Sequence, residues 1–151
     1  MDYIQGVRCN LEKELRHMAD PQKDSGLYVI WMMLSMSARL QIGALGELDF
    51  TPGTYAYVGT AQRGRSARIR RHLAVDKPRR WHMDYLRPYV TVEGITLYDG
   101  HREDECRLVK QIMAATGAKR DHPGFGASDC RCGGHLLFLP RTLHEPENLE
   151  L

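Results

Sequence analysis

Long apolar runs are absent from this sequence. No stretch approaches the 18 or so apolar residues that a membrane-spanning helix needs. The first residues, MDYIQGVRCN, contain no apolar segment of the kind found in secretory signal peptides. We therefore expect a protein that neither spans a membrane nor is secreted.

Cysteine is also scarce. Four cysteines in 151 residues do not form a disulfide framework, and Cys130 and Cys132 are too close in sequence for an easy bridge. This cysteine usage favours a reducing, cytoplasmic location. Aromatic residues make up only 8% of the chain, so few side chains are suited to stacking on nucleobases.

The composition that is present is that of a globular domain. Apolar residues make up 42% of the chain and charged residues 26%. A chain of 151 residues is long enough to bury a substantial core in a single domain.

The positive charge is concentrated in one segment. Residues 63–80 carry a net charge of +7, which leaves −5 for the rest of the chain. Such a basic segment in an otherwise acidic molecule indicates a site for a polyanion such as a nucleic-acid backbone. The ordinary alternative is a solvated helix face, although such a face usually mixes the two signs.

The hydropathy pattern predicts a small α+β domain. Short connections between the first three predicted strands favour an antiparallel meander. We divide the chain into an N-terminal helical extension (1–24), a central domain (25–139) and an irregular C-terminal tail (140–151). The predicted strands are 27–34, 39–42, 54–59, 90–98 and 135–139, and the predicted helices are 9–19, 64–75, 81–86 and 102–116.

Two short signatures, GLY at 26–28 and YVG at 57–59, lie on two predicted strands. Tyr55 and Tyr57 alternate with small residues and share one face of their strand. Tyrosines in a sheet are most often packing residues. Gly59 lies where the strand gives way to a helix, and its missing Cβ would permit a turn or the close approach of a ligand.

The helix RSARIRRHL places two polar residues beside its apolar stripe. Ile69 and Leu73 form the stripe, and Arg68 and His72 lie on its border, four residues apart. An arginine fork there suits a phosphate group, and a histidine there could transfer protons near neutral pH. The alternative is that both side chains only cover the core.

Glu105 projects onto the apolar stripe of the helix REDECRLVKQIMAATG. A buried carboxylate needs a partner, which would be an arginine in an ion pair or a hard divalent cation. If the stripe ends one turn earlier, Glu105 is instead exposed at the helix start.

Together these segments resemble the GIY-YIG nuclease superfamily. Within it, the series PGTYAYVGTA, RIRRHL, WHMDYL, EC and GFGASDCRCGGHL is similar to the branch known as domain of unknown function 123. That branch occurs in archaea and bacteria, sometimes fused to endonuclease III. The resemblance covers residues 25–139.

The resemblance implies a central antiparallel sheet of about three strands flanked by helices, and cleavage of phosphodiester bonds with one Mg²⁺ or Mn²⁺ ion. It places Tyr28 and Tyr57 at the reaction centre, Arg68 on the scissile phosphate, His72 in proton transfer or phosphate contact, and Glu105 as the metal ligand. His82 is a secondary candidate. The basic residues expected to contact the nucleic-acid backbone are Arg65, Arg70, Arg71, Lys77, Arg79 and Arg80.

The Gly-rich segment HPGFGASDCRCGG, residues 122–134, is predicted to be a loop, and it has no part in the general mechanism of the superfamily. Its Cys130, Cys132 and His135, with Cys106, are the ligand types that zinc prefers, although the C-x-C-x-x-H spacing is not that of a zinc finger. Buried free cysteines are the common alternative. The loop could instead close over the active face and bring Asp129 or His135 near the metal.

Two functions from different classes follow from these patterns. In the first, the chain is a metal-dependent endonuclease that acts on DNA, in repair or processing. In the second, the scaffold is a nucleic-acid-binding module that cuts little and assists a DNA-repair partner. RNA or another phosphoryl substrate is a further alternative.

Overall fold

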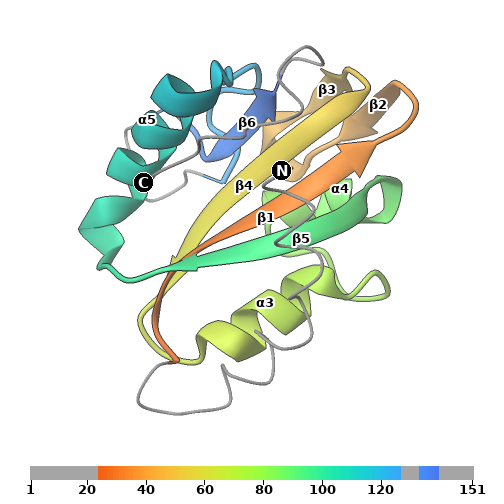
Figure 1. The fold of residues 1–151 in the computed structure, drawn as a ribbon. Helices are drawn as coiled ribbons and strands as arrows, with labels where there is room; N and C mark the ends of the chain where they lie inside the picture. The colour runs from red at the N-terminus through yellow and green to blue at the C-terminus, as the bar shows by residue number, and fades with distance from the viewer. Residues whose placement is uncertain (1–23, 127–132, 140–151) are drawn as a thin grey trace.

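The structure is a computed structural model of the chain, and it describes residues 24–126 and 133–139. Figure 1 shows a twisted sheet with helices on both faces. The strands are β1 (Gly26–Leu34), β2 (Ala38–Gln41), β3 (Glu47–Phe50), β4 (Gly53–Ala61), β5 (Thr91–Tyr98) and β6 (Leu136–Leu139). The helices are α3 (Arg65–Leu73), α4 (His82–Leu86) and α5 (Glu105–Thr116), with 3₁₀ turns at Gly43–Leu45, Arg87–Tyr89 and Arg102–Asp104.

The central sheet has four antiparallel strands in the order β5-β1-β4-β6. The nine-residue strands β1 and β4 pair along their whole length, in a register that places Tyr28 opposite Gly59. Strand β6 pairs only with the first part of β4, from Thr54 to Tyr57. The second half of β4 therefore runs past the end of β6, and its Val58 amide donates to the carbonyl of His135 instead.

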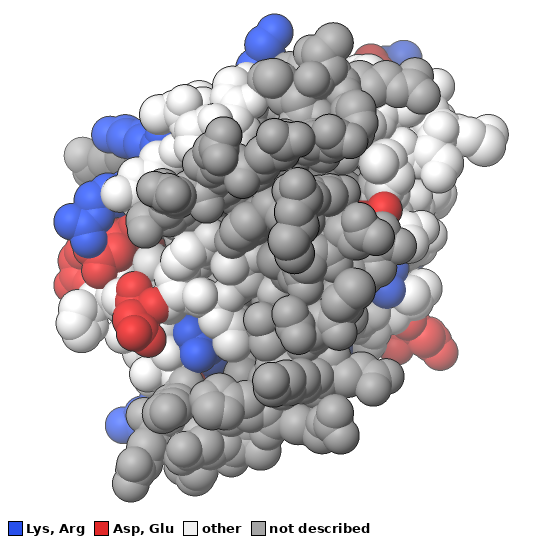
Figure 2. Space-filling model, in the orientation of Figure 1, with Lys and Arg blue, Asp and Glu red and all other residues white. Residues whose placement is uncertain are grey.

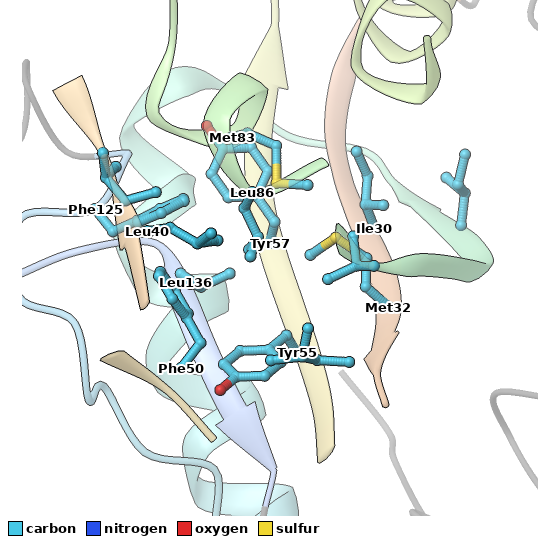
Figure 3. Close-up of a cluster of buried hydrophobic side chains, with 14 of the residues drawn as sticks. Ile30, Met32, Leu40, Phe50, Tyr55, Tyr57, Met83, Leu86, Phe125 and Leu136 are labelled. Carbon is cyan, nitrogen blue, oxygen red and sulfur yellow. The ribbon is translucent and has the colours of Figure 1, made fainter. Parts of the chain in front are cut away.

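The sheet buries both of its faces. One face carries Tyr28, Tyr55 and Tyr57 and is covered by α3, α4, the β2–β3 hairpin and Phe125. Figure 3 shows this cluster, with Tyr57 of β4 beside Met83 and Leu86 of α4 and with Tyr55 beside Phe50. The other face is covered by α5, through Leu108, Val109 and Ile112. In Figure 1, α3 and α5 accordingly lie on opposite sides of the sheet.

The structure confirms the predicted α+β class and an antiparallel central sheet, which has four strands. Every predicted strand and helix within the described residues is present, with small shifts of its ends. The predicted helix 9–19 lies outside the described residues.

The predicted meander is wrong. Strands β2 and β3 pair only with each other, in a separate two-stranded sheet, and β4 returns to pair directly with β1. The physical reason is that β1 and β4 gain nine residues of ladder from each other, whereas β2 has only four residues to offer. The hairpin instead contributes Leu40 and Phe50 to the core. In the described part of the chain, no helix is long and apolar enough to cross a membrane.

Candidate active site

A cavity of about 690 Å³ lies at the end of the β1–β4 pair, where α3, the segment before α4 and the start of α5 meet. All five residues predicted to form a reaction centre line it: Tyr28, Tyr57, Arg68, His72 and Glu105. Two secondary candidates, His82 and His135, line it as well. Asp129, Cys130 and Cys132 lie outside the described residues.

Gly59 makes room for Tyr28 in this cavity. A Cβ on Gly59 would lie 2.4 Å from both the ring carbon Cζ and the hydroxyl oxygen of Tyr28, far inside contact distance. The Tyr28 ring therefore crosses the neighbouring strand at the one residue that has no side chain. Gly59 was predicted to permit a turn or the close approach of a ligand, and in the structure it makes room for an aromatic ring.

The start of α3 is fixed by Asp24. The Asp24 carboxylate accepts hydrogen bonds from the Ser66 amide at 2.7 Å and the Ser66 hydroxyl at 3.0 Å, and the Asp24 carbonyl accepts one from the Arg65 amide. Gly64, the residue before the helix, adopts the left-handed conformation and offers no side-chain cap. A carboxylate at a helix N-terminus satisfies free amides and interacts favourably with the helix dipole. This anchor sets the position of the helix that carries Arg68 and His72.

Arg68 is half-buried on the wall of the cavity. Its Nη1 donates a long hydrogen bond of 3.4 Å to the carbonyl of Thr60. Within the described part of the chain, no carboxylate oxygen lies within 4.0 Å of its guanidinium, so its charge is not compensated by an ion pair. Such a cation at the wall of a cavity is suited to binding an anion.

His72 lies beneath Arg68 and is 1% exposed. Its Nε2 is 3.1 Å from the Tyr28 hydroxyl, and its Nδ1 has no hydrogen-bond partner in the described residues. Burial, together with the nearby charge of Lys77, lowers the pKa of His72 to about 3, against a smaller opposing effect of Asp84. The buried imidazole is therefore neutral near neutral pH in the free protein.

The two tyrosines are neutral for the same reason. Burial raises the pKa of Tyr28 well above its ordinary value, although the nearby charge of Arg68 works in the opposite direction. Burial also raises the pKa of Tyr57, and the charges of Tyr28 and Glu105 add to that effect. Tyr57 packs edge-on against the His72 ring at 5.4 Å, and its hydroxyl has no hydrogen-bond partner within the described ranges. Both hydroxyls therefore act as neutral donors and acceptors near neutral pH.

Glu105 is the first residue of α5, and its side chain is 15% exposed. Its Oε1 lies 3.0 Å from Nδ1 of His135, whose Nε2 is 3.7 Å from the sulfur of Cys106. An arginine or a divalent cation was predicted as the partner of this carboxylate. In the structure its partner is a histidine, His135. Cys106 is disulfide-bonded, so in this structure its sulfur is not a thiolate that could bind zinc.

His82, the secondary candidate, holds the opposite rim of the cavity. Its Nδ1 accepts a hydrogen bond of 2.8 Å from the amide of Gly126. A Cβ on Gly126 would come within 2.8 Å of the Tyr57 ring, so this backbone packs directly against the tyrosine. Burial lowers the pKa of His82. The geometry gives His82 a part in shaping the wall next to Tyr57.

Asp84 is fully buried and organises the basic segment before α4. Its carboxylate accepts two hydrogen bonds of 3.0 Å from Arg71, lies 3.3 Å from Nζ of Lys77, and accepts the main-chain amides of Arg80 and Trp81. The Lys77 side chain is only 6% exposed and also caps the end of α3 through the carbonyls of Arg71 and His72. Both cations are thus held by a buried carboxylate, which disfavours the predicted contact of Arg71 and Lys77 with nucleic acid.

Arg65 is likewise withdrawn from the surface. It is 5% exposed, and its Nη1 donates to the carbonyls of Leu27 and Tyr98. Its predicted contact with nucleic acid is wrong for this reason. Arg70, Arg79 and Arg80 are exposed, and Arg80 lines the cavity together with Arg102. On the face drawn in Figure 2, described side chains of both signs lie together on the side that carries α5.

Sequence reasoning missed several residues of this site. Trp81, Arg102 and Glu103 line the cavity, and Asp84 holds its wall in place. Asp84 is the third residue of α4 and accepts a hydrogen bond from the main-chain amide of Trp81 at the helix start, which is one half of a capping box. That signal was present in WHMDYL, but the burial of Asp84 and its two cationic partners depends on the loop before α4.

The donor set fits a hard divalent cation bound through one carboxylate. Within residues 24–126 and 133–139, no three His, Cys, Asp or Glu side chains are grouped closely enough to enclose a metal. Magnesium needs no such cage, because it commonly binds one or two carboxylates, water and substrate phosphate oxygens. Glu105 provides one oriented carboxylate at the cavity wall, and His135 fixes it from behind, as outer-shell partners do at metal sites.

Comparison with known proteins identifies the family. A search of the curated proteins and a search of the solved structures found no match. One family model, described as domain of unknown function DUF123, matches residues 27–150, which include β1 from Leu27 onward and all the residues that line the cavity. The chain therefore belongs to the family of the domain of unknown function DUF123.

Proposed function

We propose that this protein is a metal-dependent endonuclease of the GIY-YIG type, which hydrolyses phosphodiester bonds of DNA in repair or processing. The two signatures support the assignment. GLY and YVG lie on the adjacent antiparallel strands β1 and β4, and Tyr28 and Tyr57 project from them into one cavity. Arg68 of α3 and Glu105 of α5 reach the same cavity from opposite faces of the sheet.

The single observation that carries the proposal is the state of Arg68. A half-buried guanidinium without a carboxylate partner in the described structure lies beside two neutral tyrosine hydroxyls. A half-buried cation retained without a compensating carboxylate calls for an anionic ligand, and the planar fork of arginine matches two phosphate oxygens. Arg80 and Arg102 lie on the same cavity and add positive charge where a polyanion would approach.

The hydrogen bond between Tyr28 and His72 suggests a path for the proton of the attacking water. A neutral Tyr28 can donate its proton to His72 while its oxygen accepts one from water. Arg68 is among the charges that lower the pKa of His72. A phosphate bound to Arg68 offsets that charge, so substrate binding makes His72 a better base.

Glu105 would hold the divalent cation, Mg²⁺ or Mn²⁺, which stabilises charge on the leaving oxygen. His135 orients this carboxylate, and Tyr57 presents a hydroxyl on the same wall. Arg68 holds the phosphate and stabilises the charge that develops on its oxygens.

The second candidate is a nucleic-acid-binding module that assists a repair partner without cutting. The low pKa of His72 favours it, since an imidazole that titrates at about 3 is a weak base in the free protein. In this case Arg79, Arg80 and Arg102 would contact the phosphate backbone and the cavity would only accommodate a phosphate.

The test uses branched, nicked and single-stranded oligonucleotides with Mg²⁺ or Mn²⁺. The endonuclease proposal predicts cleavage by the wild type, loss of cleavage in Arg68→Ala and Glu105→Gln, and loss on addition of EDTA. Arg39→Ala is the matched control, because Arg39 is exposed and pairs with Glu47 on the β2–β3 hairpin, outside the cavity. Salt-sensitive binding by the wild type without cleavage would instead support the binding module.

A further inference from the structure

Trp81 lies on the cavity wall, half-buried, immediately before α4. The guanidinium carbons of Arg68 and Arg71 both lie over its ring, each 4.7 Å from the ring centroid. The His72 ring is 5.0 Å away, centroid to centroid. One indole thus contacts three polar residues of α3.

The backbone of Trp81 is fixed by the buried Asp84. Its amide donates to Asp84 at 2.9 Å, and the same carboxylate binds Arg71 through two hydrogen bonds. The backbone of Trp81 and the side chain of Arg71 are therefore both bonded to one buried carboxylate. Arg68 makes no hydrogen bond to Asp84 in the described structure, and its Nη1 donates a long hydrogen bond of 3.4 Å to the carbonyl of Thr60.

Restraint by an aromatic ring differs chemically from restraint by a carboxylate. A carboxylate would occupy the donors of the guanidinium and cancel its charge. An aromatic ring attracts the cation through its face and leaves the N–H groups in the guanidinium plane available. The side chain is held in place while both its charge and its hydrogen-bonding edge remain for a ligand.

We propose that Trp81 is a positioning residue, which holds the Arg68 guanidinium over the cavity with its donors directed at a phosphate. This inference rests on the proposed function, in which Arg68 binds the scissile phosphate. It assigns a role to the WHMDYL segment: Trp81 orients Arg68, His82 holds the wall beside Tyr57, and Asp84 anchors the start of the helix.

The first test needs no substrate. The chain has two tryptophans, so fluorotryptophan-labelled protein gives two ¹⁹F resonances, which a Trp81→Phe variant assigns. We expect Arg68→Ala to shift the Trp81 resonance and leave that of Trp31 unchanged, because Trp31 is fully buried on the other face of the sheet. An unchanged Trp81 resonance would overturn the proposal.

The second test is a double-mutant cycle on kcat and KM for cleavage, or on affinity for a fluorescein-labelled oligonucleotide if the wild type only binds. We expect Trp81→Leu to lower kcat, or the affinity, by about 3- to 30-fold, and Trp81→Phe to restore most of it. In an Arg68→Ala background, Trp81→Leu should have no further effect. Equal effects of Trp81→Leu with and without Arg68 would overturn the proposal.

Tyr85→Leu is the matched control. Tyr85 lies under Arg79 at 5.7 Å, a similar contact outside the cavity. We expect this change to alter kcat less than twofold, and an effect as large as that of Trp81→Leu would count against a specific role of Trp81. If the wild type neither binds nor cleaves any oligonucleotide, the proposed function fails, and the ¹⁹F measurement alone decides whether Trp81 holds Arg68.

Discussion

Asp84→Asn tests how strongly the basic segment depends on one buried carboxylate. Asp84 is 0% exposed and is bonded to Arg71, Lys77 and two main-chain amides. The amide of asparagine keeps the shape but removes the charge, and it leaves two cations without their counter-ion. Removing one partner of a buried ion pair costs about 3–5 kcal/mol, since the remaining charge is buried and unpaired. We expect a loss of unfolding free energy in that range.

The assay is unfolding in urea, with Asp104→Asn as the matched control. Asp104 makes the same local bond, accepting the amide of His101 three residues earlier, and it also pairs with an arginine, Arg107. It differs in its exposure to solvent, where ion pairs contribute little. We expect Asp104→Asn to lose far less stability. If both variants lose the same amount, the reasoning from burial is refuted.

The pH dependence of the unfolding free energy gives a second measure of how much the Asp84 carboxylate contributes to stability. Burial alone would raise the pKa of Asp84, but the hydrogen bonds from Arg71 and from the amides of Trp81 and Arg80 outweigh it and lower the pKa below its ordinary value. A carboxyl with a lowered pKa contributes stability above about pH 4, and that contribution is lost as the pH falls further. In Asp84→Asn this part of the acid transition should be absent.

Three further predictions concern other parts of the site. Because the pKa of His72 is lowered from 6.5 to about 3, the unfolding free energy should fall by up to about 5 kcal/mol as the pH falls between these values, and His72→Gln should flatten this slope in urea titrations. Gly59→Ala should destabilise the wild type by about 1–3 kcal/mol, through overlap with Tyr28, and should be nearly neutral when Tyr28 is leucine; equal costs in both backgrounds would contradict the overlap. Arg79→Ala should reduce the slope of log K for DNA binding against log salt concentration by about one, because Arg79 is exposed. Lys77→Met should leave that slope unchanged, because Lys77 is held by Asp84.

Much of this fold is predictable from the sequence because its periodicities are strong. The short continuous apolar run LYVIWMML favours a buried strand, and it forms most of β1, an inner strand of the sheet. The alternation around Tyr55 and Tyr57 and the stripe of Leu108, Val109 and Ile112 likewise specify β4 and α5. Strand pairing is a different matter. Proximity along the chain suggested β1–β2, but the longer ladder of β1 and β4 prevails.

The residues of the candidate site that lie on helices and strands could be predicted from the sequence, because the period of each element shows which side chains face the sheet. The 3.6-residue period places Arg68 and His72 next to the sheet, and the structure confirms that both line the cavity with the two tyrosines. Counting basic residues in the segment 63–80 does not show which of them are exposed, because that depends on burial in the fold. In the sequence, Arg65 and Lys77 cannot be distinguished from the exposed arginines. In the structure, Arg65 binds main-chain carbonyls and Lys77 binds the buried Asp84. The contact between Trp81 and Arg68 depends on a loop whose path no periodicity describes.

The most direct measurement of the central claim is the single-turnover rate of oligonucleotide cleavage by the wild type, Tyr28→Phe, Arg68→Ala and Arg39→Ala in the presence of Mg²⁺. The account predicts that Arg68→Ala reduces the rate by about 10²–10³-fold, as expected when a group that stabilises transition-state charge is removed. It also predicts a reduced rate for Tyr28→Phe and a wild-type rate for Arg39→Ala. Cleavage by Arg68→Ala at the wild-type rate would contradict it.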